Sequence, residues 1–113
     1  MTTHPGGSRR ALLLCAAGLV CIPVAGSAAE PAQAIVGIHN FAFQPAVLTV
    51  PRGTTVTWVN HDDSPHSIVL ASLNVHSHPL DTDGRFSFRF EQPGAFAYRC
   101  GLHPHMQGTV VVQ

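Results

Sequence analysis

The stretch Cys100-Gly-Leu-His-Pro-His-Met-Gln-Gly-Thr-Val-Val-Val-Gln113 combines a short loop of metal-ligand residues with a β-branched run. Within it, a thiolate (Cys100), an imidazole (His103) and a thioether (Met106) follow one another at intervals of three residues. The preceding residues 96–100 alternate as a strand does, and residues 109–112 favour a second strand. We therefore expect two strands joined by a chelating loop that needs one more ligand from elsewhere in the chain.

His66 is the best candidate for the fourth ligand. Pro65 stiffens the chain just before it, and the apolar residues 68–70 follow it closely. Taken singly, Cys100 would be a small buried residue, Met106 a core side chain and His66 an ordinary loop histidine. The regular spacing within the loop favours a shared metal site over these separate structural roles.

The types of ligand indicate copper. Two imidazoles and a thiolate, with a more distant thioether, are typical of the trigonal electron-transfer copper site. Sulfur ligands favour Cu(I) and imidazole suits Cu(II), so this mixed set accepts both oxidation states. We predict one type 1 copper site, Cu(I)/Cu(II), formed by His66, Cys100, His103 and Met106. A ligand set that the fold holds nearly unchanged through the redox cycle permits fast electron transfer.

Residues 1–29 have the pattern of a cleavable secretory signal peptide. Arg9 and Arg10 precede an apolar run over residues 11–25, and small residues lead to Glu30. The arginine pair also resembles a twin-arginine export signal. The apolar run is short and contains Pro23, so it does not suit a membrane span of about 20 residues. We expect export to a bacterial periplasm and no stable membrane insertion once the leader is removed.

The chain has three cysteines, of which Cys15 and Cys21 lie in the predicted leader. After its removal Cys100 is the one remaining thiol, so an internal disulfide is impossible. A lone cysteine in an exported protein requires an explanation, and metal ligation supplies one.

The charge of the predicted mature chain is slightly negative. From residue 30 onward there are four arginines and six carboxylates, which gives a net charge of about −2. No basic patch is evident, so nucleic acid is not an expected partner.

Residues 30–113 are predicted to form one all-β domain. Alternating apolar runs separated by Pro and Gly turns favour a Greek-key β-sandwich of seven to eight strands. The clearest alternation is at residues 86–90, where three phenylalanines point inward, and another places Val56 and Trp58 on one face. The polar stretch 71–84 is expected to be a loop that crosses between the sheets. A domain this small gains stability from a bound metal.

The chain resembles the cupredoxins, the type 1 blue copper proteins, and within them is most similar to amicyanin, pseudoazurin and plastocyanin. The resemblance rests on residues 43–45, 53–60 and 65–66, and on the Cys-x-x-His-Pro-x-Met loop, which has the short amicyanin spacing. It implies a plastocyanin-like sandwich with copper at one end, bound by the four ligands named above. It further implies a monomeric, soluble carrier of single electrons, not an enzyme. Redox proteins such as a cytochrome, dehydrogenase or reductase would dock at the His103 face.

Two residues depart from these relatives. Ser67 stands where several cupredoxins have an asparagine that ties the two ligand loops together, so we expect that side-chain tie to be shorter or absent. His105 occupies a phenylalanine position in the ligand loop and is expected to face solvent. His76 and His78 suggest a second metal site, although a polar loop explains them better. These extra histidines support the alternative function, a periplasmic copper carrier or chaperone that delivers or buffers copper without electron shuttling.

Overall fold

The computed structural model describes residues 32–113, so the predicted leader 1–29 lies outside the described residues. The described part consists of nine strands and one 3-10 turn. They are β1 (Gln33–His39), β2 (Ala42–Gln44), β3 (Val47–Val50), β4 (Thr54–Asn60), β5 (Val69–Leu70), η2 (Ala71–Leu73), β6 (Val75–His76), β7 (Arg85–Phe90), β8 (Gly94–Arg99) and β9 (Gln107–Val112).

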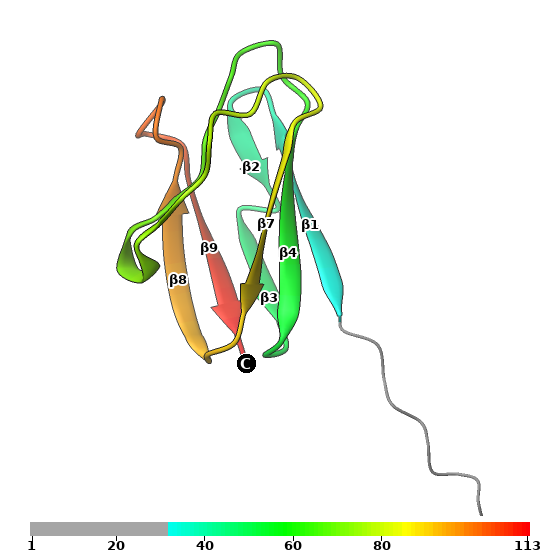
Figure 1. Ribbon diagram of the computed structural model, residues 1–113, viewed down its shortest axis with the longest axis vertical. Helices are drawn as coiled ribbons and strands as arrows, with labels where there is room; N and C mark the ends of the chain where they lie inside the picture. The colour runs from blue at the N-terminus through cyan, green and yellow to red at the C-terminus, as the bar shows by residue number, and fades with distance from the viewer. Residues whose placement is uncertain (1–31) are drawn as a thin grey trace, which may run out of the picture. The chain divides into compact units, whose positions relative to one another are not determined.

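The strands form two mixed sheets, as Figure 1 shows. One sheet has the order β2-β1-β4-β7 and the other has the order β3-β9-β8-β5-β6. The pairs β1–β4 and β3–β9 are parallel, and the remaining pairs are antiparallel. Consecutive strands therefore pass repeatedly from one sheet to the other, which confirms the all-β sandwich expected from the sequence.

Residues 32–113 form nine strands, not the seven to eight expected, because the stretch 71–84 is not wholly a loop. It contains η2 and β6, and β6 pairs with β5 through Val69↔His76 and Leu70↔Val75. Both strands have only two residues, too few for an alternating pattern to be visible in the sequence. Their ladder forms at the edge of the second sheet, where the polar side chain of His76 faces solvent.

The core lies between the sheets and confirms the predicted inward faces. Val56 and Trp58 of β4 are fully buried, and Trp58 contacts the rings of Phe86, Phe90 and Tyr98. Phe90 is buried, whereas Phe86 is half-buried at the margin of the same core. Burial of each large apolar side chain contributes on the order of 2 kcal/mol. Copper ligation is therefore not the only source of stability in this domain.

Four connections meet at one end of the sandwich. They are the β1–β2 turn and the loops that follow β4, β6 and β8 (Figure 1). The loops after β4 and β6 are joined by the backbone pair His66–Leu80, with N···O distances of 3.1 and 2.6 Å. The buried Asn60 side chain strengthens this junction by donating hydrogen bonds to the carbonyls of Ser64 and Leu80. His66 is thus held in place by backbone hydrogen bonds.

Across residues 32–113, no helix is both long and apolar enough to cross a membrane.

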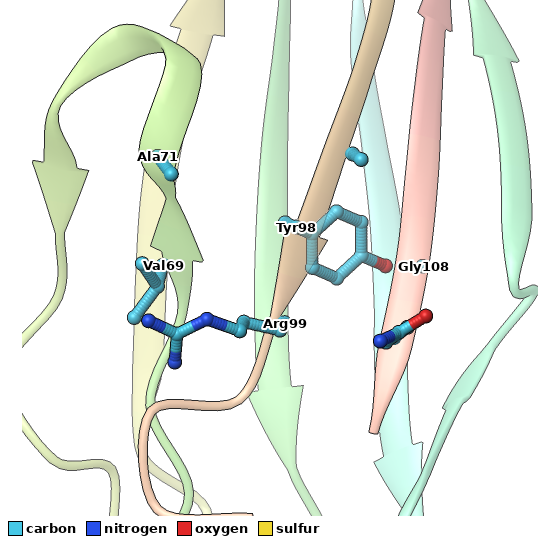
Figure 2. Close-up of a pocket in the computed structure, with 7 residues that line it drawn as sticks. Val69, Ala71, Tyr98, Arg99 and Gly108 are labelled. Carbon is cyan, nitrogen blue, oxygen red and sulfur yellow. The ribbon is translucent and has the colours of Figure 1, made fainter. Parts of the chain in front are cut away.

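A surface pocket of about 260 Å³ lies on the five-stranded sheet, lined mainly by residues of β5, β8 and β9 (Figure 2). Its lining contains none of the four predicted copper ligands. Figure 2 shows the ring of Tyr98 crossing from β8 toward Gly108 of β9.

Tyr98 is buried, and its hydroxyl has no hydrogen-bond partner among the described residues. The indole Nε1 of Trp58 is likewise buried and without a partner there. Burial raises the pKa of Tyr98 to about 12. The folded state therefore keeps this phenol protonated in a pH range where the unfolded chain, with a pKa near 10, ionises it. The stability contributed by the raised pKa is complete below pH 10 and is lost as the pH rises toward 12.

The alkaline behaviour gives a prediction for Tyr98→Phe. Because Tyr98 is the single tyrosine of the chain, tyrosinate absorbance reports on this residue alone. The folded protein should titrate near pH 12 and the protein in denaturant near pH 10. Tyr98→Phe should change the free energy of unfolding at pH 7 by less than about 1 kcal/mol, because the hydroxyl has no partner to lose. It should also flatten the loss of stability between pH 10 and 12. Folded-state titration near pH 10 would contradict this account.

Candidate metal centre

Cys100 follows the last residue of β8 and is fully buried. Its backbone N–H donates to the carbonyl of Met106 (3.1 Å), and the Met106 N–H donates to the carbonyl of His103 (2.9 Å). These bonds close residues 100–106 into a compact loop between β8 and β9. The loop is short because the two strands are adjacent and antiparallel, pairing Arg99 with Gln107. The three loop residues predicted as ligands are therefore positioned by backbone geometry.

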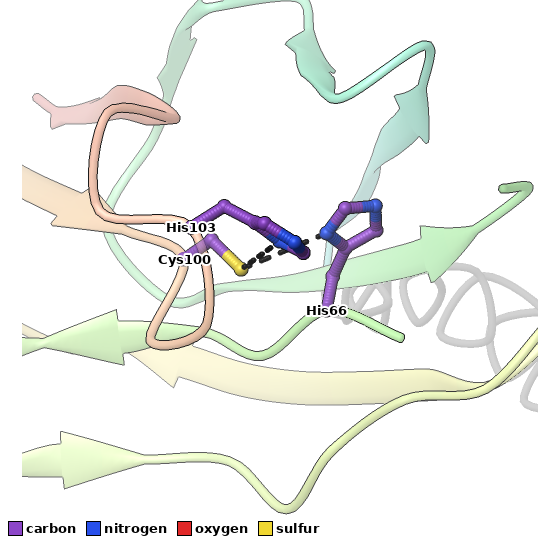
Figure 3. Close-up of side chains that lie close together, drawn as sticks. All are labelled: His66, Cys100 and His103. Carbon is purple, nitrogen blue, oxygen red and sulfur yellow. Dashed lines mark hydrogen bonds between the residues drawn. The ribbon is translucent and has the colours of Figure 1, made fainter. Parts of the chain in front are cut away.

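The imidazole of His66 approaches the same sulfur from the other loop. Its Nδ1 lies 3.7 Å from the Cys100 Sγ, and its ring is fully buried. His103 places its own Nδ1 3.8 Å from that Sγ and is half-buried. Figure 3 shows both rings directed at the sulfur atom. The three ligand atoms lie within 4.8 Å of one another, and residues 32–113 contain no other group of three or more His, Cys, Asp or Glu residues so arranged.

These distances fit a first-row metal ion in a trigonal arrangement. With about 2.3 Å from metal to sulfur and about 2.0 Å from metal to nitrogen, an angle of about 120° separates sulfur and nitrogen by about 3.7 Å. The observed separations of 3.7 and 3.8 Å match this value. One thiolate and two imidazoles in a trigonal arrangement are the donors that type 1 copper uses. The residues present therefore fit copper, the cofactor of the family that they resemble.

Met106 has its side chain buried in the same core as Cys100, with 3% of its surface exposed. Its backbone is bonded on both sides, to Cys100 and to His103, so it is held within the ligand loop. A thioether held in this loop would be available to a bound copper ion as a weak additional ligand. The structure thus brings three of the predicted ligand atoms together and places the fourth residue in the same closed loop.

The two ligand loops are tied together by Ser67, so the side-chain tie that was expected to be shorter or absent is present. Its backbone N–H donates to the Cys100 sulfur (3.4 Å), and its hydroxyl accepts a hydrogen bond from the Gly101 N–H (3.0 Å). The short serine side chain can reach the Gly101 N–H because residue 101 has no side chain. A Cβ at that position would lie 2.6 Å from the Ser67 hydroxyl. Hydrogen bonds to a ligating thiolate tune the properties of the metal.

Sequence reasoning did not identify Asp62 as a part of this site. The Asp62 carboxylate lies 2.9 Å from the Nε2 of His66 and accepts the backbone N–H groups of Asn40 and Phe41. Burial raises the pKa of Asp62, but the hydrogen bonds from Phe41, His66 and Asn40 outweigh it and hold that pKa below its usual value. An acidic residue four positions before a predicted ligand histidine was the available signal.

Phe41 is the second residue that was missed. It lies in the β1–β2 turn, and its ring meets those of His66 and His103 edge to face, each at a centroid distance of 5.1 Å. Although it covers both imidazoles, 45% of Phe41 remains exposed. The Phe41 ring therefore covers the two imidazoles and is also part of the protein surface.

The other histidines that the sequence singled out lie apart from this cluster, and His76 belongs to strand β6 and not to a loop. His76 and His78 are exposed and belong to no ligand group within the described residues. His105 is exposed as expected, with its ring centroid 6.4 Å from that of His103. Within residues 32–113, the geometry supports one metal site.

The family model described as "Cupredoxin-like domain" matches residues 11–112. Among curated relatives, amicyanin from Paracoccus denitrificans is 29% identical over 80% of this chain and 73% of its own. Amicyanin-alpha from Methylorubrum extorquens is 32% identical, over 69% of this chain and 70% of its own. Plastocyanin from Scenedesmus fuscus is 34% identical, over 63% of this chain and 86% of its own.

Solved structures are similar as well. The purple cupredoxin from Nitrosopumilus maritimus superposes with a TM-score of 0.64 and 35% identity, covering 71% of this chain and 99% of that one. The Cu(I) form of an amicyanin variant gives a TM-score of 0.68 at 29% identity, covering 77% of this chain and 87% of that one.

Proposed function

The chain belongs to the family of cupredoxin-like domains, and from this premise we propose that it is a blue copper protein that carries single electrons between redox partners. The observation that carries the proposal is the placement of two imidazole nitrogens at 3.7 and 3.8 Å from one buried thiolate. The ligands we propose are His66, Cys100, His103 and Met106. Bound copper would supply one-electron redox chemistry by alternating between Cu(II) and Cu(I).

The protein contributes a ligand set that has little freedom to move. His66 is fixed by its two backbone bonds to Leu80, and Cys100 by its bonds to Met106 and Ser67. Burial of the Cys100 sulfur excludes water and oxidants from the thiolate. A site that need not rearrange between oxidation states has a low barrier to electron exchange, which is what a carrier requires.

The surface near His103 suits brief docking. His103 is the more exposed of the two imidazoles, and Phe41 and Leu102, with 45% and 48% of their surfaces exposed, provide apolar contact area beside it. We propose that electrons leave through His103 to a cytochrome, dehydrogenase or reductase. Small apolar contacts of this kind are typical of weak, transient redox complexes.

Met106→Leu tests the role proposed for the thioether. Leucine has a similar volume, so the free energy of unfolding should change by less than about 1.5 kcal/mol and copper should remain bound. Loss of a sulfur donor disfavours the electron-poor Cu(II) state, so the midpoint potential measured by protein voltammetry should rise. A lower potential, or loss of copper with the fold intact, would rule out the axial role.

A cysteine hydrolase is the enzymatic alternative to an electron carrier. Asp62, His66 and Cys100 form a connected chain resembling acid, base and nucleophile. Catalysis would require a substrate carbonyl to reach the sulfur, yet Cys100 and His66 are both fully buried. The second imidazole on the same sulfur is also unexplained by a hydrolase. We therefore propose a carrier and not an enzyme.

Copper delivery is the second candidate function, favoured by the exposed His105 beside His103. A delivery protein would pass copper to an apo-enzyme faster than the metal dissociates and would cycle sluggishly at an electrode. A carrier would show rapid, reversible voltammetry and retain its metal. Measuring both on one preparation separates the two functions, and His105→Phe should slow only metal transfer.

We propose further that residues 1–29 direct export to the periplasm and that residues 30–113 act there as a soluble monomer. The leader pattern supports the first point, and a thiol buried within the site is consistent with an oxidising compartment. Mass spectrometry of the protein from a bacterial periplasmic extract should find a new N-terminus at residue 29 or 30. An intact leader in the cytoplasmic fraction would contradict it.

A further inference from the structure

The β1–β2 turn has a strained backbone, and a residue of the loop that follows β4 holds it in place. Asn40 and Phe41 both have positive φ, +53° and +57°, in a two-residue hairpin that pairs His39 with Ala42. Such hairpins require positive φ at both central residues. Asparagine adopts positive φ readily, whereas a bulky aromatic residue adopts it rarely and at a cost in energy. A residue held in this region costs on the order of 1–3 kcal/mol, so contacts elsewhere must offset the strain of Phe41.

The Asp62 carboxylate provides those contacts. Oδ1 accepts the N–H of Asn40 (2.7 Å), and Oδ2 accepts the N–H of Phe41 (2.9 Å). Oδ2 also lies 2.9 Å from the Nε2 of His66. Only 11% of the Asp62 side chain is exposed, and the ionised carboxylate makes all three bonds charge-assisted. One carboxylate therefore joins the turn to a copper ligand.

This arrangement determines which nitrogen of His66 faces the metal position. An ionised carboxylate only accepts hydrogen bonds, so the Nε2 of His66 must carry the proton. The lone pair is then left on Nδ1, the nitrogen that lies 3.7 Å from the Cys100 sulfur. A carboxylate behind a ligating histidine also makes that imidazole more basic and a better donor to the metal.

We infer that Asp62 is a positioning residue for copper: it fixes His66 with Nδ1 directed at the metal and holds the Asn40–Phe41 turn so that the Phe41 ring covers both imidazoles. The inference rests on the proposed function in assigning His66 as a ligand. Asp62 does not touch the metal position, and its effect passes through His66 and Phe41. It adds to the four predicted ligands an acidic residue that sets their orientation.

Asp62→Asn tests the inference, with Asp63→Asn as the matched control. The Asn amide has no charge and one acceptor oxygen for three donors, so its NH₂ group faces at least one of them and His66 Nε2 loses its charge-assisted acceptor. Asp63 is its neighbour, carries the same charge and is exposed, with no hydrogen bond or ion pair to another residue within 32–113. Comparing the two variants therefore separates the bonds of Asp62 from the loss of a negative charge near copper.

The first readout requires no metal. Long-range ¹H–¹⁵N NMR of the full metal-free protein should show His66 protonated at Nε2 in the wild type and in Asp63→Asn. In Asp62→Asn that tautomer should lose its dominance, and the amide protons of residues 40 and 41 should exchange faster. Asp62→Glu, which retains two acceptor oxygens, should restore the Nε2–H tautomer. An unchanged tautomer in a folded Asp62→Asn protein would overturn the inference.

The second readout uses Cu(II) alone as the probe. Removal of a carboxylate behind a ligating histidine should weaken Cu(II) affinity about 10- to 100-fold in Asp62→Asn. A surface change such as Asp63→Asn should alter it by less than about threefold. Equal affinities and equal midpoint potentials in the two variants would overturn the inference. Failure of the wild type to form a coloured copper complex would instead refute the proposed function, and the metal-free measurement would still test Asp62.

Discussion

Replacing Cys100 with serine is expected to abolish the intense orange-red absorption of the copper-loaded protein. That absorption requires charge transfer from a thiolate to copper, and a serine hydroxyl is not a thiolate. Because Cys100 is fully buried between two imidazoles, no other thiol of the described residues can take its place. Copper added to this variant should bind through imidazoles alone, weakly and with little colour.

The chain supplies a matched control for this experiment. Cys15 and Cys21 lie in the predicted leader, so the double change Cys15→Ser and Cys21→Ser should leave the spectrum unchanged. The amide NMR spectrum of metal-free Cys100→Ser should remain dispersed, which separates loss of the ligand from loss of the fold. Retention of the intense band in Cys100→Ser would refute the assignment of Cys100 as the copper thiolate.

Gly108→Ala is expected to destabilise the protein by about 3 kcal/mol, the upper end of the range for overpacking a core. A Cβ at residue 108 would contact the Tyr98 hydroxyl and lie 2.5 Å from its Cζ. The ring cannot retreat, because it packs edge to face against Phe43 at 4.7 Å and Trp58 at 5.3 Å. Chemical denaturation of the metal-free protein at pH 7 measures the change.

Gly37→Ala serves as the control, since its new Cβ would meet only ordinary contacts, the nearest being His61 at 3.6 Å. Both glycines lie in strands, so the comparison removes the general effect of glycine on a sheet. Combining Gly108→Ala with Tyr98→Phe should recover part of the lost stability by removing the clashing hydroxyl. Equal stabilities of Gly108→Ala and Gly37→Ala would show that β8 and β9 are less tightly packed than described.

Much of the fold could be predicted because its strands are long enough to show a period. β4 and β7 have seven and six residues, and their alternation placed Val56, Trp58 and Phe90 in the core correctly. β5 and β6 have two residues each, which carry no period, so their ladder appears only in three dimensions. The order of the strands in each sheet could not be predicted from the alternation of apolar residues either, because the parallel pairs β1–β4 and β3–β9 join segments that are distant in the sequence.

The proposed ligand residues could be selected from the sequence because copper requires unusual side chains at fixed spacing. Asp62 and Phe41 were not, because a carboxylate and a phenylalanine have many ordinary roles. Their importance depends on the β1–β2 turn lying beside the loop after β4, a contact across more than 20 residues. Ser67 shows the same limit: its hydroxyl reaches Gly101 only because the two loops approach closely.

Titration of the metal-free protein with Cu(II), followed by visible absorption and EPR, tests the central claim most directly. The geometry at Cys100, His66 and His103 predicts an intense thiolate-to-copper band that saturates at one equivalent, with one copper environment per chain. A colourless or weakly bound complex would contradict the assignment of a type 1 copper site.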